Sequence, residues 1–304
     1  MSLLCSIIIP TYYKQEMLKK NLSHNIKFLK DCEIIIVNDA PNDILKINDF
    51  PEISNENLHI ISHNVNKGFG SSINDGVAIA RSDKIFLLNN DVRLLDDSYK
   101  KAIFKLDEDK FLFAVSFAQK EKSGKIIGKN ILKWEKGYIL HDKASNIVFG
   151  KNAWAEGGSA IFDKNKFEKL NGFDELYNPF YWEDIDLSYR AWKRGWHVFF
   201  DPEILVEHHH ESTIGTSFKK DYVQEIAYRN QYIFQWKNIE DFSFIIKHIL
   251  SVFFVILSAF LHFDTVHLKG FFKAIRLLPR IFKKRKENFS CESDEKIVFM
   301  FGKN

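Results

Sequence analysis

Cysteine is scarce in this sequence: Cys5, Cys32 and Cys291 are the only three in 304 residues, and they lie far apart. Such spacing argues against a disulfide framework or a zinc ribbon and favours a reducing compartment. The net charge of +3 is too small to indicate a nucleic-acid partner. The first ten residues have neither the basic start nor the cleavage site of a secretion signal. We therefore expect a cytoplasmic protein that does not bind nucleic acid.

Complete nucleotide-binding fingerprints are also missing. Residues 66–72 read NKGFGSS, but Gly76 comes too late for a Gly-x-Gly-x-x-Gly motif, and no Gly-Lys-Ser/Thr follows. A dinucleotide or ATP site is therefore weakly supported. Gly68 and Gly70 can still allow backbone N–H groups to face an anion at a helix start.

Strands and helices alternate through the first hundred residues. Short apolar runs predict strands, and apolar residues at helical spacing predict helices. The predicted strands are 6–9, 33–37, 58–61 and 84–88, and the predicted helices are 15–28, 71–80 and 182–195. Continuously apolar strands in such an alternation indicate a parallel sheet covered on both faces. Ligands of such sheets bind at the carboxyl ends of the strands.

Two carboxylates follow predicted strands at that edge. Asp39 follows the run IIIVN, and its side chain could accept hydrogen bonds from a nucleotide base or ribose. A turn aspartate is the alternative, since the turn APND follows directly. Asp91 follows Asn89 and Asn90 and could bind the hard cation that a diphosphate needs, although a polar loop would look the same.

Three acidic residues begin the predicted helix at 182–195: Glu183, Asp184 and Asp186. They could simply satisfy the free N–H groups and the dipole at the helix start. Alternatively, one of them could take a proton from a hydroxyl, and the dipole would then keep that carboxylate ionised.

A histidine run, His208-His209-His210, follows the apolar segment ILV and Glu207. Successive residues of a strand point to opposite sides, so all three cannot easily bind one metal. One imidazole could bind a metal together with Asp91, or the run could be structural.

These pieces occur in a fixed order that resembles the inverting family 2 glycosyltransferases of GT-A fold. Eight motifs between Leu4 and Ser217 carry the resemblance, namely IIIPTY at 7–12, VND at 37–39, NxGFG with Asn74, LNND at 88–91, GGS at 157–159, GFDE at 172–175, EDIDL at 183–187 and VxH at 206–208. The order is most similar to the bacterial branch that contains rhamnosyltransferase-like enzymes of surface polysaccharide assembly.

The resemblance implies a role for each matching residue. Asp184 would be the catalytic base, and Asp91 and His208 would bind a divalent metal, Mn²⁺ or Mg²⁺. The remaining implied residues would contact the nucleotide-sugar donor or border the acceptor, and they are Pro10, Thr11, Tyr12, Asp39, Gly68, Asn89, Asn90, Gly158, Trp182 and Glu183. Asn89 replaces the first aspartate of the family's Asp-x-Asp motif and removes one charge from the metal site.

The implied reaction moves a hexosyl or deoxyhexosyl group to an acceptor hydroxyl with inversion, in surface polysaccharide or lipid-linked glycan assembly. The implied fold is a Rossmann-like mixed α/β sheet with helices on both faces. A non-catalytic scaffold on this fold, or a nucleotide-binding regulator, is the competing interpretation. Asn89 and the basic C-terminal stretch are its only support.

The C-terminal part differs in composition, so we place a boundary between a catalytic domain, 1–237, and a helical region, 238–304. Residues 242–263 hold one full charge, Lys247, and are long enough to cross a bilayer. Residues 269–286 hold eight Lys and Arg residues and no acidic residue. A single crossing would place this basic stretch outside, against the positive-inside tendency. We expect helices on the inner leaflet of the cytoplasmic membrane. A soluble helical appendage is the alternative.

Overall fold

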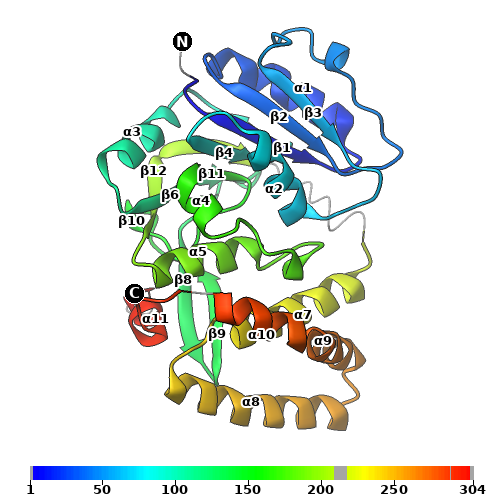
Figure 1. The fold of residues 1–304 in the computed structure, drawn as a ribbon, viewed down its shortest axis with the longest axis vertical. Coiled ribbons are helices and arrows are strands. Elements are labelled where there is room, and N and C mark those ends of the chain that lie inside the picture. The colour runs from blue at the N-terminus through cyan, green and yellow to red at the C-terminus, as the bar shows by residue number, and fades with distance from the viewer. Residues whose placement is uncertain (1–2, 209–217, 288, 302–304) are drawn as a thin grey trace.

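The computed structural model describes residues 3–208, 218–287 and 289–301 (Figure 1). A ten-stranded mixed sheet forms its centre, with the strand order β10-β12-β6-β11-β4-β1-β2-β3; in addition, β5 pairs with β12 and β7 pairs with β6. The strands of this sheet are β1 (Ser6–Thr11), β2 (Glu33–Asn38), β3 (Leu58–Ser62), β4 (Lys84–Leu88), β5 (Val92–Leu94), β6 (Leu112–Lys120), β7 (Ile126–Ile127), β10 (Gly150–Lys151), β11 (Ser159–Asp163) and β12 (His197–His208).

The N-terminal half of the sheet is parallel, as the sequence predicts. β1 pairs with β2 and β4, and β2 pairs with β3, all in parallel. Successive apolar residues serve opposite faces: Ile8 lies in one core, and Ile7 and Ile9 lie in the other. This alternation with no polar interruption is why the strands read as continuous apolar runs.

Helices cover both faces of the sheet. α1 (Gln15–Asn25) and α3 (Lys100–Glu108) bury apolar side chains in one core, and α2 (Phe69–Ile79), α4 (Lys164–Lys169) and α5 (Glu183–Lys193) bury theirs in the other. The predicted helix at 15–28 ends earlier, because 26–28 form the 3₁₀ turn η1. The short helices η2 (Ile47–Asp49) and η3 (Glu175–Tyr177) complete this region. The mixed α/β sheet with helices on both faces is confirmed.

The second half of the sheet is not parallel throughout. β11 runs antiparallel to β4 and β6, while β12 runs parallel to β6 and antiparallel to β5. The pairing of β12 with β5 sets His208 opposite Val92, so His208 lies next to Asp91. His209 and His210 lie outside the described residues.

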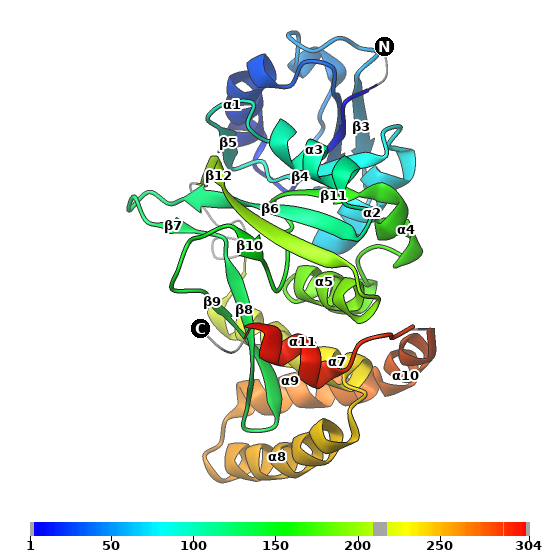
Figure 2. The same ribbon diagram turned by 90° about the vertical axis from the view of Figure 1, so that its left-hand side faces the viewer.

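In the part of the chain that the structure describes, a hairpin and five helices form the other end of the molecule (Figures 1 and 2). The hairpin consists of β8 (Asn130–Glu135) and β9 (Tyr138–Lys143). The helices are α7 (Lys220–Asn238), α8 (Phe242–Leu261), α9 (Thr265–Arg276), α10 (Leu278–Glu287) and α11 (Asp294–Phe301). Because α7 packs on η3 and α5 as well as on α9 and α10, it connects the two ends. The domain boundary at 237 stays a prediction.

Among the described residues, only α8 is long and apolar enough to cross a membrane, by length and composition alone. The mean hydropathy of its most apolar 18 residues is 2.3, and 17% of these residues are buried in the protein.

Candidate functional site

A cavity of about 380 Å³ lies at the carboxyl ends of β1, β2 and β4. That volume suits a small-molecule ligand. Every predicted site residue except Trp182 lines it, namely Pro10, Thr11, Tyr12, Asp39, Gly68, Asn89, Asn90, Asp91, Gly158, Glu183, Asp184 and His208. The structure thus brings together residues that are up to 198 positions apart in the sequence, from Pro10 to His208.

Asp39 holds the loop before α2 in place. Its Oδ1 accepts hydrogen bonds from the backbone N–H of Lys67 (2.8 Å) and from His63 Nδ1 (2.7 Å), and its Oδ2 accepts one from the N–H of Gly68 (2.8 Å). The N–H group of Gly68, which the sequence analysis expected to face an outside anion, is therefore bound to this carboxylate, as is that of Lys67. Since a carboxylate has about four lone-pair sites, one on Oδ2 remains for a ligand.

Asn90 ties the ends of two strands together. Its side-chain amide donates a hydrogen bond to Thr11 Oγ1 at 2.9 Å, and its backbone carbonyl accepts one from Asn21 at 2.8 Å. These bonds fix the loop that carries Asp91, so the two predicted binding residues Thr11 and Asn90 have a shared structural task.

Gly158 allows a close approach to the first residue of that loop. Its carbonyl accepts a hydrogen bond from the N–H of Asn89 at 2.9 Å. A Cβ on Gly158 would overlap the side-chain amide of Asn89. Glycine at this position therefore fixes where Asn89 faces the cavity.

Asp91 and His208 form the pair that could hold a metal. His208 Nε2 lies 3.2 Å from Asp91 Oδ1, and His208 Nδ1 donates a hydrogen bond to Gln119 Oε1 at 2.5 Å. In the neutral ring this bond leaves the lone pair on Nε2, facing Asp91 and the cavity. Such an outer hydrogen bond is typical of metal-binding histidines. An imidazole and a carboxylate with this orientation fit a divalent cation.

Among the described residues, no three or more His, Cys, Asp or Glu side chains lie close enough together to hold a metal ion. The ligands beyond Asp91 and His208 would therefore come from elsewhere. Hard cations in phosphate-transferring sites commonly take their remaining ligands from water and from substrate phosphates. The pair Asp91–His208 therefore fits a metal that binds together with a diphosphate.

Glu183 and Asp184 lie side by side in the cavity wall at the start of α5. Burial, reinforced by the charge of Glu156, raises the pKa of Asp184 to about 7. Burial and the neighbouring Asp184 raise the pKa of Glu183 well above its ordinary value. The expectation that the helix dipole keeps Asp184 fully ionised is therefore wrong, because desolvation outweighs it. A pKa near neutrality nevertheless suits a general base.

The raised pKa of Glu183 favours its protonated form. The residue is buried, and no donor or acceptor among the described residues reaches its Oε2. A protonated carboxyl group can donate one hydrogen bond. Because Glu183 lines the cavity, an oxygen of a bound ligand is the partner that would satisfy it.

Trp182 does not line the cavity. It precedes α5 with φ 77°, and its ring packs on Phe234 and on His141, with ring centroids 5.0 and 4.9 Å away. Tyr181 also has a positive φ, 72°. Two successive non-glycine residues in the left-handed backbone region cost free energy, and such strain is common at functional sites. The backbone turn directs Trp182 into the core and leaves the following carboxylates at the cavity.

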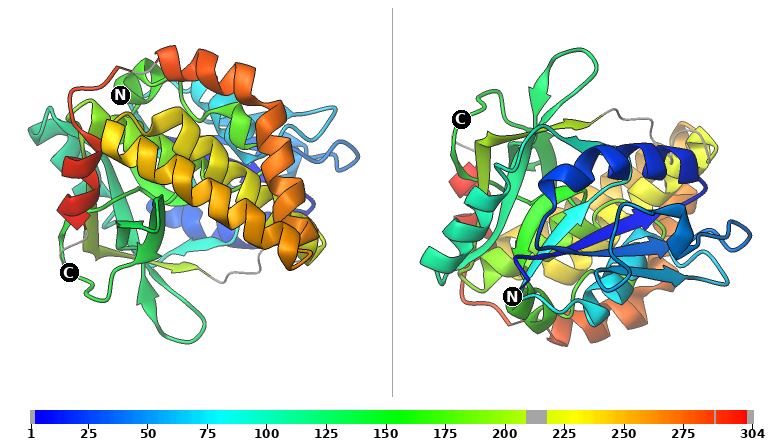
Figure 3. Two further views of the ribbon diagram at one scale, coloured as in Figure 1. Left: turned by 90° about the horizontal axis from the view of Figure 1, so that it is seen from below. Right: turned by 90° about the horizontal axis from the view of Figure 1, so that it is seen from above.

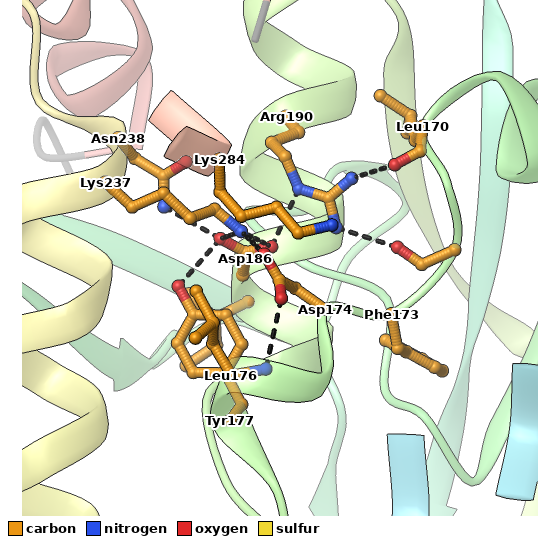
Figure 4. Close-up of polar contacts among 12 residues, drawn as sticks. Leu170, Phe173, Asp174, Leu176, Tyr177, Asp186, Arg190, Lys237, Asn238 and Lys284 are labelled. Carbon is orange, nitrogen blue, oxygen red and sulfur yellow. Dashed lines mark hydrogen bonds and ion pairs between the residues drawn. The ribbon is translucent and has the colours of Figure 1, made fainter. Parts of the chain in front are cut away.

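A buried ionic cluster holds α5 in position (Figure 4). Asp186 accepts hydrogen bonds from Arg190 (2.7 Å) and Lys237 (2.9 Å), and also from Tyr177 and Asn238. Lys237 binds Asp174 at 2.6 Å as well. Burial alone would raise the pKa of Asp186, but Arg190 and Lys237 hold it well below its ordinary range. Asp186, the third acid of the helix start, is thus a structural residue that links α5 to α7.

The sequence interpretation missed several cavity residues. The wall also contains Phe69, Ser72, Gln119, Glu156, Pro179, Phe180, Tyr181 and Phe218. Glu156 accepts hydrogen bonds from Lys143 (2.5 Å) and Asn130 (3.0 Å). Burial opposes its ionisation, but Lys143 lowers its pKa below the ordinary value. The sequence signal for Gln119 is weak: a glutamine directly follows the apolar run LFAVSFA, where a strand is expected to end.

Comparisons with known proteins show the family and the fold of the chain. The family model described as "Glycosyl transferase family 2" matches residues 6–170, more than half of the chain. A search of curated proteins gives no match. Among solved structures, GalNAc-T7 with UDP, GalNAc and Mn²⁺ aligns at TM-score 0.60 and 14% identity, over 78% of this chain and 48% of that one. This chain thus spans about half the length of GalNAc-T7.

Two further structures align over larger shares of their own chains. The mannosyltransferase PcManGT from Pyrobaculum calidifontis, in complex with GDP-Man and Mn²⁺, gives TM-score 0.54 and 12% identity over 92% of this chain and 76% of its own. S. aureus TarS 1–349 with UDP aligns at TM-score 0.53 and 14% identity, over 83% of this chain and 71% of its own. The identities are low, so these likenesses establish the GT-A fold alone.

Proposed function

This chain belongs to glycosyl transferase family 2, and from that premise we propose an inverting, metal-dependent transfer of a hexosyl or deoxyhexosyl group. The donor is a nucleoside diphosphate sugar, and the acceptor is a hydroxyl of a glycan or a lipid-linked glycan. The observation that carries the proposal is a single cavity that holds both the Asp91–His208 pair and Asp184, a carboxyl group with a pKa near neutrality. The fold neighbours were solved with UDP or GDP-Man, two of them with Mn²⁺.

Asp184 acts as the base in this proposal. Its ionised carboxylate takes the proton of the acceptor hydroxyl, whose oxygen attacks the anomeric carbon. The bond between that carbon and the diphosphate oxygen breaks, and its electron pair leaves with the nucleoside diphosphate. Attack from the face opposite the leaving group inverts the anomeric configuration. Glu183, whose raised pKa favours the protonated form, would donate a hydrogen bond to a substrate oxygen.

Asp91 and His208 would hold the metal, with Gln119 orienting the imidazole. Bound Mn²⁺ or Mg²⁺ would neutralise negative charge on the departing diphosphate. Asp39, Asn89 and Asn90 lie on the same side of the sheet edge as this pair and would contact the nucleotide. Pro10, Thr11, Tyr12 and Gly68 complete that wall, and Gly158 borders the acceptor.

The proposed setting is the cytoplasmic face of the cytoplasmic membrane, in bacterial surface polysaccharide or lipid-linked glycan assembly. Two considerations support it: a nucleotide-sugar donor is used where it is made, and the sequence has an apolar and then basic C-terminal region. The rhamnosyltransferase-like branch suggested by the motif order points to the same setting.

A donor screen followed by two variants tests the function. Thermal shift with a panel of nucleotide sugars, with and without Mn²⁺, should identify the donor, because a ligand of the native state raises its stability. Asp184→Ala should then bind the donor normally and transfer no sugar, while Asp91→Ala should lose metal-dependent donor binding in calorimetry. NMR of the product should show the inverted anomer. Donor binding without hydrolysis or transfer by the unaltered protein would instead indicate a non-catalytic nucleotide-binding protein.

A further inference from the structure

An unusual apolar face lies far from the cavity, on α8. Ten large apolar side chains between residues 242 and 263 are exposed, namely Phe242, Ile246, Ile249, Leu250, Phe253, Phe254, Leu257, Phe260, Leu261 and Phe263. Their spacing places them on one side of the helix. The polar residues exposed on α8 are Ser243, Lys247 and Ser258. A continuous apolar surface of this kind marks an interaction site in a water-soluble protein.

The inner side of α8 is fitted to the β8–β9 hairpin. Phe244 stacks on Trp134 with ring centroids 3.8 Å apart, and His248 Nδ1 donates a hydrogen bond to the carbonyl of Gly137 at 2.8 Å. Gly137 has φ +80°, and a Cβ there would come within 2.7 Å of the Lys247 carbonyl. The hairpin and the helix therefore meet at backbone contact, and α8 is an integral part of the folded protein.

Basic residues adjoin the apolar face. Seen from below, α8 crosses the near face of the molecule, and α9 and α10 follow it along the edge of that face (Figure 3). Phe272 of α9 packs against Phe260 of α8, with ring centroids 6.5 Å apart, so the apolar face continues onto the next helix. No acidic residue occurs in 265–286. The exposed cations of this stretch are Lys269, Arg276, Arg280, Lys283 and Lys286.

We propose that the apolar face of α8, together with the cations of α9 and α10, binds an anionic lipid bilayer, with α8 lying in the plane of the interface. An apolar strip beside a predominantly basic one, in which Glu287 at the end of α10 is the one acidic residue, matches the boundary between acyl chains and anionic headgroups. A second copy of the chain would place the basic helices of two molecules near each other, which their charge disfavours. This proposal stands independently of the catalytic one.

The length of α8 allows a crossing, but its packing argues for the plane. Twenty residues at about 1.5 Å each match the thickness of the hydrocarbon core. A crossing helix, however, would have to leave the hairpin and break the Trp134 stack and the His248 hydrogen bond. α9, with 12 residues, is too short to return across the membrane. Lying flat preserves the inner contacts and covers the outer face.

Vesicle binding by the full chain tests the proposal. The unaltered protein should sediment with phosphatidylcholine vesicles that contain phosphatidylglycerol and bind vesicles without it at least about a hundredfold less, at about 0.1 M salt. The double variant Phe253→Ser, Phe254→Ser should lose about tenfold or more of the binding to both vesicles. Phe104→Ser is the matched control, because Phe104 on α3 is 64% exposed, as are Phe253 and Phe254. Equal melting temperatures of the variants would show that folding is intact.

A charge variant tests the basic side separately. Arg280→Gln with Lys283→Gln should weaken binding to anionic vesicles by roughly thirtyfold, at about 1 kcal/mol per cation. Lys110→Gln with Lys125→Gln, two exposed lysines elsewhere, should leave it unchanged.

Three results would overturn the proposal. The first is unchanged vesicle binding after both double substitutions. The second is a dimer in sedimentation that Phe253→Ser, Phe254→Ser makes monomeric, without vesicle binding, which would make a second copy the occupant. The third is retention of the protein in membranes after an alkaline carbonate wash, which would indicate a crossing helix.

Discussion

Asp184→Asn should remove the base and yet stabilise the protein at neutral pH. The pKa of Asp184 is about 7 in the folded protein, against 3.8 for an ordinary aspartate. Between these values the native state holds a proton that the unfolded state has released, so stability falls as the pH rises and the full cost remains above pH 7. At about 1.4 kcal/mol per pKa unit, the difference is at most roughly 4 kcal/mol. Because Asp184 is partly exposed to the open cavity, we expect about half of that, ~2 kcal/mol.

Urea unfolding at two pH values measures this effect. The variant should be ~2 kcal/mol more stable than the unaltered protein at about pH 8 and only ~0.5 kcal/mol more stable at about pH 4.5, because the cost disappears as the pH approaches the unfolded-state pKa of 3.8. A stability difference that does not change with pH, or a less stable variant at pH 8, would refute the assignment of a buried carboxyl group with a raised pKa.

Asp186→Asn is the matched control, two residues further along the same helix. The pKa of Asp186 is depressed, because Arg190 and Lys237 outweigh its burial. Its ionised form therefore contributes stability that is present above about pH 4 and lost as the pH falls through the lowered pKa. Removing the charge leaves the buried Lys237 and Arg190 poorly paired and should cost about 3–5 kcal/mol at neutral pH. The two aspartates should thus respond with opposite signs.

Three further predictions follow from the cavity. The kcat/KM of the unaltered enzyme should fall below about pH 7 as Asp184 takes up its proton; a profile that is flat between about pH 5 and 8 would argue against this base. Gln119→Leu removes the hydrogen bond that orients His208 and should weaken Mn²⁺ binding in calorimetry by about 10–100-fold, whereas equal affinity would exclude a positioning role. Gly158→Ala should displace the Asn89 amide and raise the KM for the donor. Unchanged donor affinity would count against a donor contact by Asn89.

Most of the cavity could be predicted because its residues follow strands in short motifs. The carboxyl ends of β1, β2 and β4 must meet at one edge of a parallel sheet, so Thr11, Asp39 and Asp91 converge there. Trp182 was harder to predict, since it adjoins Glu183 in the sequence. Its orientation depends on a positive φ, which a residue-type pattern does not reveal for tryptophan.

Partners that come from distant strands were beyond the reach of local patterns. Gln119 and Glu156 belong to the site because β6 and the segment before β11 pass the same edge, and neither lies in a strand-end motif that the sequence analysis recognised as binding. The pKa values likewise depend on burial and on neighbours. Asp184 and Asp186 are two residues apart in one helix start, yet burial raises the pKa of one and two cations lower that of the other.

The sequence by itself determined the parallel half of the sheet, because that depends on local periodicity and on where strands end. The candidate base Asp184 and the metal pair Asp91–His208 came from the resemblance of the ordered motifs to family 2 glycosyltransferases. The tertiary structure alone decided which acids face the cavity, which N–H groups Asp39 occupies, and how α8 presents its apolar side. These properties depend on contacts between segments that are far apart in the chain: α5 with α7 through Lys237, and the β8–β9 hairpin with α8 through Gly137. No periodicity within one segment encodes what another segment covers.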